Sequence, residues 1–217
     1  MKTTDSLVNV EAGPVTLEGF LAIPENATAI VVFVHGSGSS RHSPRNQAVA
    51  RTFNEYGLAT LLFDLLTAEE EVIDLETRHL RFDIPMLAER VVGTVKWLTE
   101  FESTQKMKIG LIGSSTGAAA ALVAAAELGE AIGSVVSRGG RPDLAGADLP
   151  QVRAPTLLVV GGYDYQVIEL NEQAYAQLQC EKKLEIVPHA THLFEESGTL
   201  EQAAHLARSW FVQHLSH

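Results

Sequence analysis

The chain has 217 residues, of which 46% are hydrophobic, and this length suits one domain with a substantial core, which we expect to span residues 1–217. Sixteen basic residues against twenty-seven acidic ones give a formal net charge of −11, which repels nucleic acid and anionic membrane surfaces and excludes them as expected partners. The single cysteine excludes an intramolecular disulfide and a cysteine-rich metal site.

Strand-like runs and helix-length segments alternate along most of the chain. The expected strands cover residues 7–10, 15–23, 29–34, 58–63, 107–112, 132–137, 155–160 and 184–187. The expected helices cover residues 46–56, 84–101, 115–128, 167–178 and 200–215, and the longest segments expected to be irregular are 64–81 and 138–153. This alternation predicts an α/β fold with a mostly parallel sheet of about eight strands and helices on both faces.

Two features indicate the order of the strands in this sheet. Residues 30–34 and 157–160 are apolar at every position, as expected for strands covered on both faces, so we place them at the centre. The first two strands are joined near Gly13 by a turn that is too short for a crossover helix. They should therefore pair antiparallel at one edge of the sheet.

The sequence Gly-Ser-Ser-Thr-Gly at residues 113–117 lies where a mostly apolar strand gives way to an alanine-rich helix. A Gly-x-Ser-x-Gly turn between a strand and a helix is typical of a nucleophile elbow, in which the central serine has a strained backbone and an exposed hydroxyl. Glycines on either side avoid collisions in so sharp a turn. Ser115 is therefore the candidate nucleophile.

Ligands bind beyond the carboxyl ends of the strands in open parallel sheets, and the loops expected there contain Ser115, Asp164 and His192 in chain order. A serine, an acid and a histidine can form a nucleophile with its general base and orienting carboxylate. His189 competes with His192 as the base. Asp164 could instead be a turn residue after two glycines.

This order, together with His-Gly-Ser-Gly-Ser at 35–39 and His-Leu-Phe-Glu-Glu at 192–196, resembles the α/β-hydrolase superfamily and, within it, the dienelactone hydrolase-like group over essentially the whole chain. The resemblance implies an α/β-hydrolase fold, and the short chain leaves little room for a large cap, so none is expected. It implies attack by Ser115, proton transfer by His192, orientation by Asp164 and an oxyanion hole from the backbone N–H groups of Ser37 and Thr116. It implies neither a metal nor an organic cofactor.

Dienelactone hydrolases proper carry cysteine at the position that matches Ser115. A serine nucleophile favours ordinary carboxylic esters of small to medium acyl groups, cleaved through an acyl-enzyme. The alternatives are the same machinery acting on lactones, thioesters, amides or organophosphate esters, and a binding or regulatory module of the same fold with little turnover. His35, which precedes the oxyanion loop, is expected to support that loop.

Several arginines are expected around the mouth of the site, and Arg41 and Arg138 are the candidate substrate-binding residues for an anionic group. The alternative is that these arginines pair with Asp64, Asp83 and Asp143 to stiffen loops. The three glutamates at 69–71 are interpreted as solvated surface.

Neither a signal-peptide core nor a run of roughly 20 apolar residues is found, so the sequence predicts a soluble cytoplasmic protein. Its expected partner is a small-molecule ester. The chain is expected to be a monomer or a homodimer.

Overall fold

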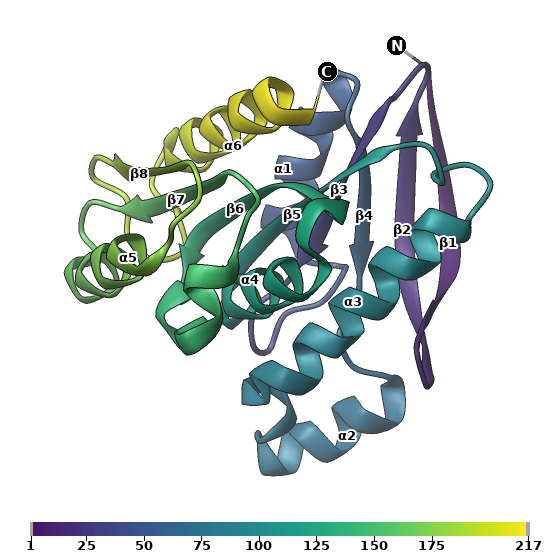
Figure 1. Ribbon diagram of the computed structural model, residues 1–217, viewed down its shortest axis with the longest axis horizontal. Helices are drawn as coiled ribbons and strands as arrows, with labels where there is room; N and C mark the ends of the chain where they lie inside the picture. Colours follow the sequence, from purple (N-terminus) through teal and green to yellow (C-terminus); the bar gives the residue numbers. More distant parts are fainter. Residues whose placement is uncertain (1, 216–217) are drawn as a thin grey trace.

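The computed structural model describes residues 2–215, in which eight strands form one sheet in the order β1-β2-β4-β3-β5-β6-β7-β8 (Figure 1). β1 pairs antiparallel with β2 and β2 pairs antiparallel with β4, whereas every other neighbouring pair is parallel. The strands are β1 (Thr3–Ala12), β2 (Val15–Pro24), β3 (Ala29–Val34), β4 (Ala59–Phe63), β5 (Lys108–Ser115), β6 (Ile132–Gly140), β7 (Thr156–Gly161) and β8 (Lys182–Val187). The mostly parallel sheet and its antiparallel edge hairpin are confirmed.

Helices cover both faces of the sheet: α1 and α6 lie on one side, and α3, α4 and α5 lie on the other (Figure 1). The helices are α1 (Pro44–Glu55), α2 (Ala68–Thr77), α3 (Ile84–Glu100), α4 (Thr116–Leu128), α5 (Tyr165–Gln177) and α6 (Thr199–Leu215), with short 3-10 helices η1 (Leu80–Phe82), η2 (Gly129–Ala131) and η3 (Pro142–Gln151). Within residues 2–215, none of these helices combines the length and the apolar character that crossing a membrane requires.

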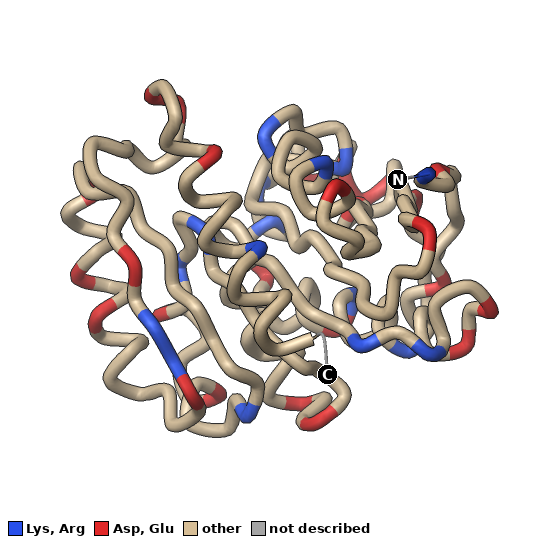
Figure 2. Tube along the Cα trace, turned by 90° about the horizontal axis from the view of Figure 1, so that it is seen from above, with Lys and Arg blue, Asp and Glu red and all other residues tan. Residues whose placement is uncertain are grey.

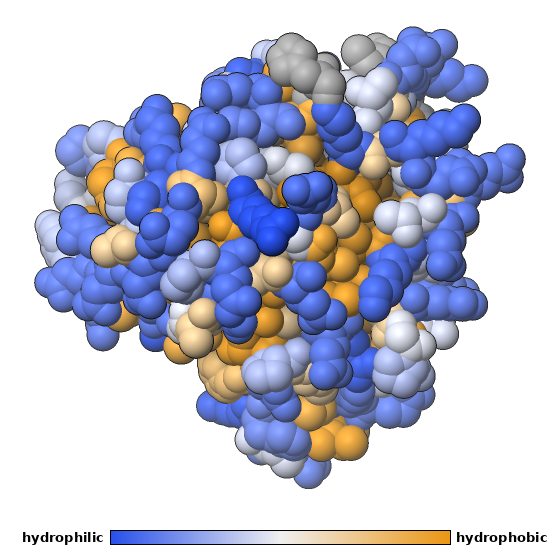
Figure 3. Space-filling view, in the orientation of Figure 1, coloured by the Kyte–Doolittle hydropathy of each residue, from blue (hydrophilic) through white to orange (hydrophobic). Residues whose placement is uncertain are grey.

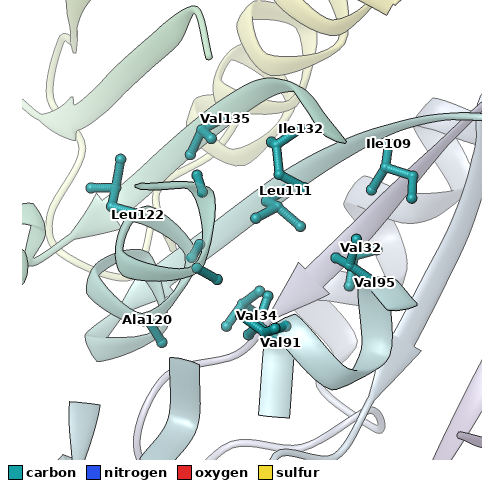
Figure 4. Close-up of a cluster of buried hydrophobic side chains, with 14 of the residues drawn as sticks. Val32, Val34, Val91, Val95, Ile109, Leu111, Ala120, Leu122, Ile132 and Val135 are labelled. Carbon is teal, nitrogen blue, oxygen red and sulfur yellow. The ribbon is translucent and has the colours of Figure 1, made fainter. Parts of the chain in front are cut away.

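The central strands supply both layers of the core because successive side chains point to opposite faces of the sheet. In β3, Val32 and Val34 pack with α3 and α4, as Figure 4 shows, whereas Val31 and Phe33 pack with α1 and α6. All six β3 residues are buried. The uninterrupted apolar run in the sequence is therefore explained by a strand that faces two hydrophobic layers.

The segment 64–81 was expected to be irregular, but it contains α2 and η1. α2 begins with a capping box, in which Thr67 Oγ1 accepts from the Glu70 N–H and the Glu70 carboxylate accepts from the Thr67 N–H. Its apolar side chains Val72, Ile73 and Leu75 are exposed, so they do not contribute to either core layer. The second irregular segment, 138–153, likewise contains the end of β6 and η3.

α2 lies beyond α3 at one end of the molecule, and Figure 3 shows hydrophobic residues reaching the surface there. The exposed fractions are 64% for Val72, 51% for Ile73 and 66% for Leu75, and Phe82 in η1 is 57% exposed. The expectation that the three glutamates at 69–71, in the first turn of α2, are solvated needs one correction, because Glu70 forms an ion pair with the buried Arg90.

We expect Gly93→Ala to lower the free energy of unfolding by about 1–3 kcal/mol, although alanine is normally the better helix former. Gly93 lies in α3 where a Cβ atom would be 2.6 Å from the backbone carbon of Ala12, so the helix and the β1–β2 hairpin would have to separate. Urea unfolding measures the change. Thr99→Ala, on the exposed side of the same helix, is the matched control, and equal stability of both variants would contradict this packing.

Candidate active site

Ser115 occupies a strained turn between β5 and α4, with φ of 50° and ψ of −127°. Positive φ is unfavourable for a residue with a Cβ atom and persists only where the surrounding structure enforces it. A Cβ atom on Gly113 would lie 2.3 Å from Ala118 Cα, and one on Gly117 would lie 2.2 Å from the Val34 carbonyl oxygen. The flanking glycines are thus required by close backbone packing.

Asp164 and His192 lie in the loops after β7 and β8, and the pairing of these strands brings the loops together. His192 Nδ1–H donates to Asp164 Oδ2 at 2.7 Å. This hydrogen bond leaves Nε2 of the imidazole free to act as a base. His192 and Ser115 line the same cavity of about 270 Å³, so the structure brings the three predicted residues to one site.

His189 has different surroundings. Its Nδ1 hydrogen-bonds with the Tyr163 hydroxyl at 2.8 Å, and this pair is exposed. Because Asp164 bonds to His192 and not to His189, the geometry favours His192 as the base.

The loop after β3 lies directly beside the elbow, since a Cβ atom on Gly36 would be 2.9 Å from Ser115 Cβ. The Ser37 N–H donates to Thr116 Oγ1 at 3.1 Å, so the two residues expected to form the oxyanion hole are neighbours. A substrate oxyanion would have to replace that hydroxyl as the acceptor for the Ser37 N–H.

His35 ties this loop to the end of β4. Its Nε2 accepts from the Leu65 N–H at 3.1 Å, and its Nδ1–H donates to the Gly36 carbonyl at 2.9 Å. Burial lowers the pKa of His35, which favours the neutral imidazole that these two bonds require. The expected supporting role therefore has a direct geometric basis.

A second cavity of about 200 Å³ lies on the other side of the oxyanion loop and shares Gly36, Ser37 and Ser39 with the first. Its wall is partly apolar, formed by Leu65, Leu66, Leu75 and Leu87, and also contains Asp64, Glu71, Asp74 and Arg81, which pairs with Asp74. Two cavities of different chemical character thus flank the loop.

The two arginines predicted to bind substrate have different environments. Arg41 pairs with Asp64 and Glu18 and lies over the Phe20 ring, and it does not line the cavity that contains Ser115. The geometry therefore does not support substrate binding by Arg41, because its guanidinium is already occupied in stiffening a loop. Arg138, at the end of β6, lines the cavity beside Ser115.

Sequence reasoning missed Asn46 and Glu196. Asn46, near the start of α1, accepts from Arg138 Nη2 at 2.7 Å. The Glu196 carboxylate accepts from the Thr191 N–H at 3.0 Å and from the Thr191 hydroxyl at 2.6 Å, which closes the loop that carries His192. Glu196 could have been proposed as a site residue from its position in the His-Leu-Phe-Glu-Glu segment, whereas no motif in the sequence indicates Asn46.

The sequence model of the Dienelactone hydrolase family matches residues 17–216. The chain belongs to the dienelactone hydrolase family. A crystal structure of a dienelactone hydrolase from Anabaena variabilis is 59% identical, covers 99% of this chain and 100% of its own, and superposes with a TM-score of 0.97. Est1E from Butyrivibrio proteoclasticus, 17% identical with a TM-score of 0.79 over 97% of this chain and 99% of its own, shares the fold.

A Mycobacterium tuberculosis protein named "Putative phosphoribosyl transferase" is 54% identical to this dienelactone hydrolase-family chain over 211 residues. The match covers 97% of this chain and 47% of the relative, so the chain spans about half the length of that protein.

The α/β-hydrolase fold is confirmed, and no large cap interrupts residues 2–215. Within the same residues, no group of three or more His, Cys, Asp or Glu side chains is arranged to hold a metal ion.

The buried, neutral His35 should make stability depend on pH. Since the pKa of folded His35 lies below its usual value of 6.5, the unfolded chain takes up the proton first, and stability falls as pH drops through 6.5. We expect His35→Gln, which keeps an acceptor for the Leu65 N–H but does not titrate, to be less stable at pH 7.5 and less pH-sensitive between pH 5 and 7. Urea unfolding at each pH tests this, and equal pH dependence of both proteins would contradict it.

Proposed function

We propose that this chain is a serine hydrolase that cleaves carboxylic esters of small to medium acyl groups through an acyl-enzyme on Ser115. One arrangement supports the proposal. The strained elbow serine lines a cavity together with a histidine whose imidazole forms a hydrogen bond with an aspartate. Membership of a hydrolase family supports the reaction type. The serine at the elbow supports ordinary esters as substrates.

In this mechanism Ser115 Oγ attacks the carbonyl carbon, and its proton passes to His192 Nε2. Asp164 accepts from Nδ1–H and stabilises the imidazolium that forms. The backbone N–H groups of Thr116 and Ser37 donate to the oxyanion, and Thr116 is well placed at the start of α4, where the helix dipole favours negative charge. The imidazolium then protonates the leaving alkoxide.

The second half of the cycle repeats these steps with water. His192 removes a proton from the water, whose oxygen attacks the acyl carbon. The tetrahedral intermediate collapses and expels Ser115 Oγ, which takes the proton back from His192, and the carboxylic acid is released. Lactones, thioesters and organophosphate esters could enter the same cycle, because the triad acts on the reacting centre and not on the rest of the substrate.

The Mycobacterium tuberculosis relative is about twice as long as this chain, and its name refers to a transferase. We infer that the transferase activity in its name belongs to the part that this chain does not match, because the matched part carries a hydrolase fold. We also propose that residues 1–217 form one hydrolase domain, since both core layers are built on the same sheet. The substrate would be a small ester.

Ser115→Ala should lower turnover of small nitrophenyl esters by at least about a thousandfold and abolish labelling by a fluorophosphonate probe. The reason is that alanine has no oxygen to attack the carbonyl or the phosphorus atom. Steady-state kinetics and mass spectrometry of the labelled peptide measure the two effects.

Ser103→Ala is the matched control, because this serine lies on an exposed turn away from the cavity. It should keep both activities. Absence of labelling in the wild-type protein, together with ester turnover that is unchanged in Ser115→Ala, would show that the elbow serine is not a working nucleophile. A binding or regulatory module of the same fold would then be the better description.

A further inference from the structure

We propose that Glu196 is a positioning residue for His192. Its carboxylate holds Thr191, the residue immediately before the histidine, and thereby keeps the imidazole in the orientation that the reaction requires. Glu196 is not among the described residues that line the cavity beside Ser115, so it acts through its neighbour and not on the substrate. This inference rests on the proposed hydrolase function and adds a residue to its machinery.

The loop that carries His192 covers residues 188–198 and joins β8 to α6 (Figure 1). Ala190 and Phe194 are buried in the core layer beneath α6. Between these two anchors, Thr191 and Leu193 are exposed, and the His192 side chain is 39% exposed. Burial therefore fixes both ends of this short segment but not its middle, where the histidine lies.

The backbone of this loop is strained on both sides of the histidine. The angle φ is 64° at His189 and 55° at Phe194, which are two of the five non-glycine residues with positive φ within residues 2–215. Such a conformation persists only where surrounding contacts enforce it. The loop would consequently relax, and His192 would move, if the contacts that hold its middle were removed.

The side of the loop that faces the sheet is held by close packing. A Cβ atom on Gly161, at the end of β7, would lie 2.5 Å from the Ala190 carbonyl oxygen, and one on Gly139, in β6, would lie 3.0 Å from the His192 carbonyl oxygen. The Tyr163 N–H also donates to the Ala190 carbonyl at 2.9 Å. This packing prevents movement toward the sheet, but it does not by itself prevent movement away from it.

Glu196 supplies the attachment on the other side. Its Oε2 accepts from the Thr191 N–H at 3.0 Å and its Oε1 accepts from the Thr191 hydroxyl at 2.6 Å. Its own carbonyl oxygen accepts from the N–H and the hydroxyl of Thr199, the first residue of α6, at 3.1 Å and 2.7 Å. A continuous set of hydrogen bonds thus connects a helix packed in the core to the residue before His192.

The geometry of Glu196, and not its charge alone, distinguishes it from other acidic residues. The chain carries a net charge of −11, and Figure 2 shows its acidic residues spread around the periphery. The adjacent Glu195 is 63% exposed, and its carboxylate pairs with Arg45 on α1 at 3.4 Å. The two hydrogen bonds from Thr191 lower the pKa of Glu196, so the group remains an ionised acceptor at neutral pH.

The position of His192 is critical because the ring has two partners. Its Nδ1–H donates to Asp164 Oδ2 at 2.7 Å, while Nε2 must reach the hydroxyl of Ser115. Moving the backbone before the histidine would lengthen both contacts together. A displacement of about 1 Å in a catalytic group lowers the rate by up to about a hundredfold.

In Glu196→Ala we expect kcat for nitrophenyl butyrate to fall by about tenfold to a hundredfold with KM nearly unchanged, because the base is displaced and the cavity is not. Glu196→Gln, which keeps the shape and one acceptor oxygen, should have an intermediate kcat. Glu195→Ala is the matched control, since it removes the same charge and side chain from the next position of the loop, and its kcat should stay within about twofold of the wild type.

A double-mutant cycle with Thr191→Val tests the route through Thr191. Valine keeps the branched shape and the backbone N–H but removes the hydroxyl that donates to Glu196. Adding Thr191→Val to Glu196→Ala should lower kcat little further, because the hydroxyl has already lost its partner. Fully additive effects on kcat would overturn the proposal. Thr191→Val and Glu196→Gln also keep it testable if Glu196→Ala fails to fold.

Nuclear magnetic resonance of protein with isotope-labelled histidine separates this inference from the proposed hydrolase function, since it needs no turnover. The His192 Nδ1–H signal, assigned by its loss in His192→Gln, should exchange faster with water in Glu196→Ala than in Glu195→Ala. Faster exchange in a protein that turns over no ester would support the positioning role and contradict the hydrolase. Ester turnover with unchanged kcat and unchanged exchange in Glu196→Ala, even with a lower Tm, would show a merely structural role and overturn the positioning role.

Discussion

The site depends on the close approach of three backbone segments around Ser115. β3 and β5 are adjacent parallel strands in which Val34 faces Gly113, so the loop after one strand meets the elbow after the other. Side chains at Gly36, Gly113 or Gly117 would collide with neighbouring main-chain or Cβ atoms at 2.9 Å or less. The strained serine conformation is stable because the core layers on both faces hold these segments together, and the strain in turn directs the serine side chain away from the sheet.

The strand order also brings Asp164, His192 and Arg138 to the edge of the sheet where Ser115 lies. β5, β6, β7 and β8 are consecutive neighbours in the sheet, so the loops at their carboxyl ends form one continuous rim. The aspartate after β7 and the histidine after β8 are brought into contact, and Arg138 at the end of β6 lies between them and the elbow strand. A single topological feature therefore accounts for the positions of the candidate catalytic groups and of Arg138.

Electrostatics distinguishes this site from the rest of an acidic chain. Elsewhere buried arginines are paired with carboxylates, and the buried histidine of the oxyanion loop is kept neutral by its two hydrogen bonds. The cavity beside Ser115 instead contains the Arg138 guanidinium, whose Nη2 donates to the neutral acceptors Asn46 Oδ1 and Ser114 Oγ. Neutral acceptors compensate a buried charge less well than a carboxylate does.

The sequence by itself determined the fold class and the edge hairpin, and it marked Ser115, Asp164 and His192 as candidates, because each feature is encoded locally: apolar strands, a short turn and polar residues at strand ends. It did not reveal α2, whose apolar residues point away from the core, or the roles of Asn46 and Glu196. It also did not show that Arg41 is held by two carboxylates. Those outcomes depend on which side chains meet across elements distant in the sequence, and only tertiary packing decides whether a buried charge finds a carboxylate.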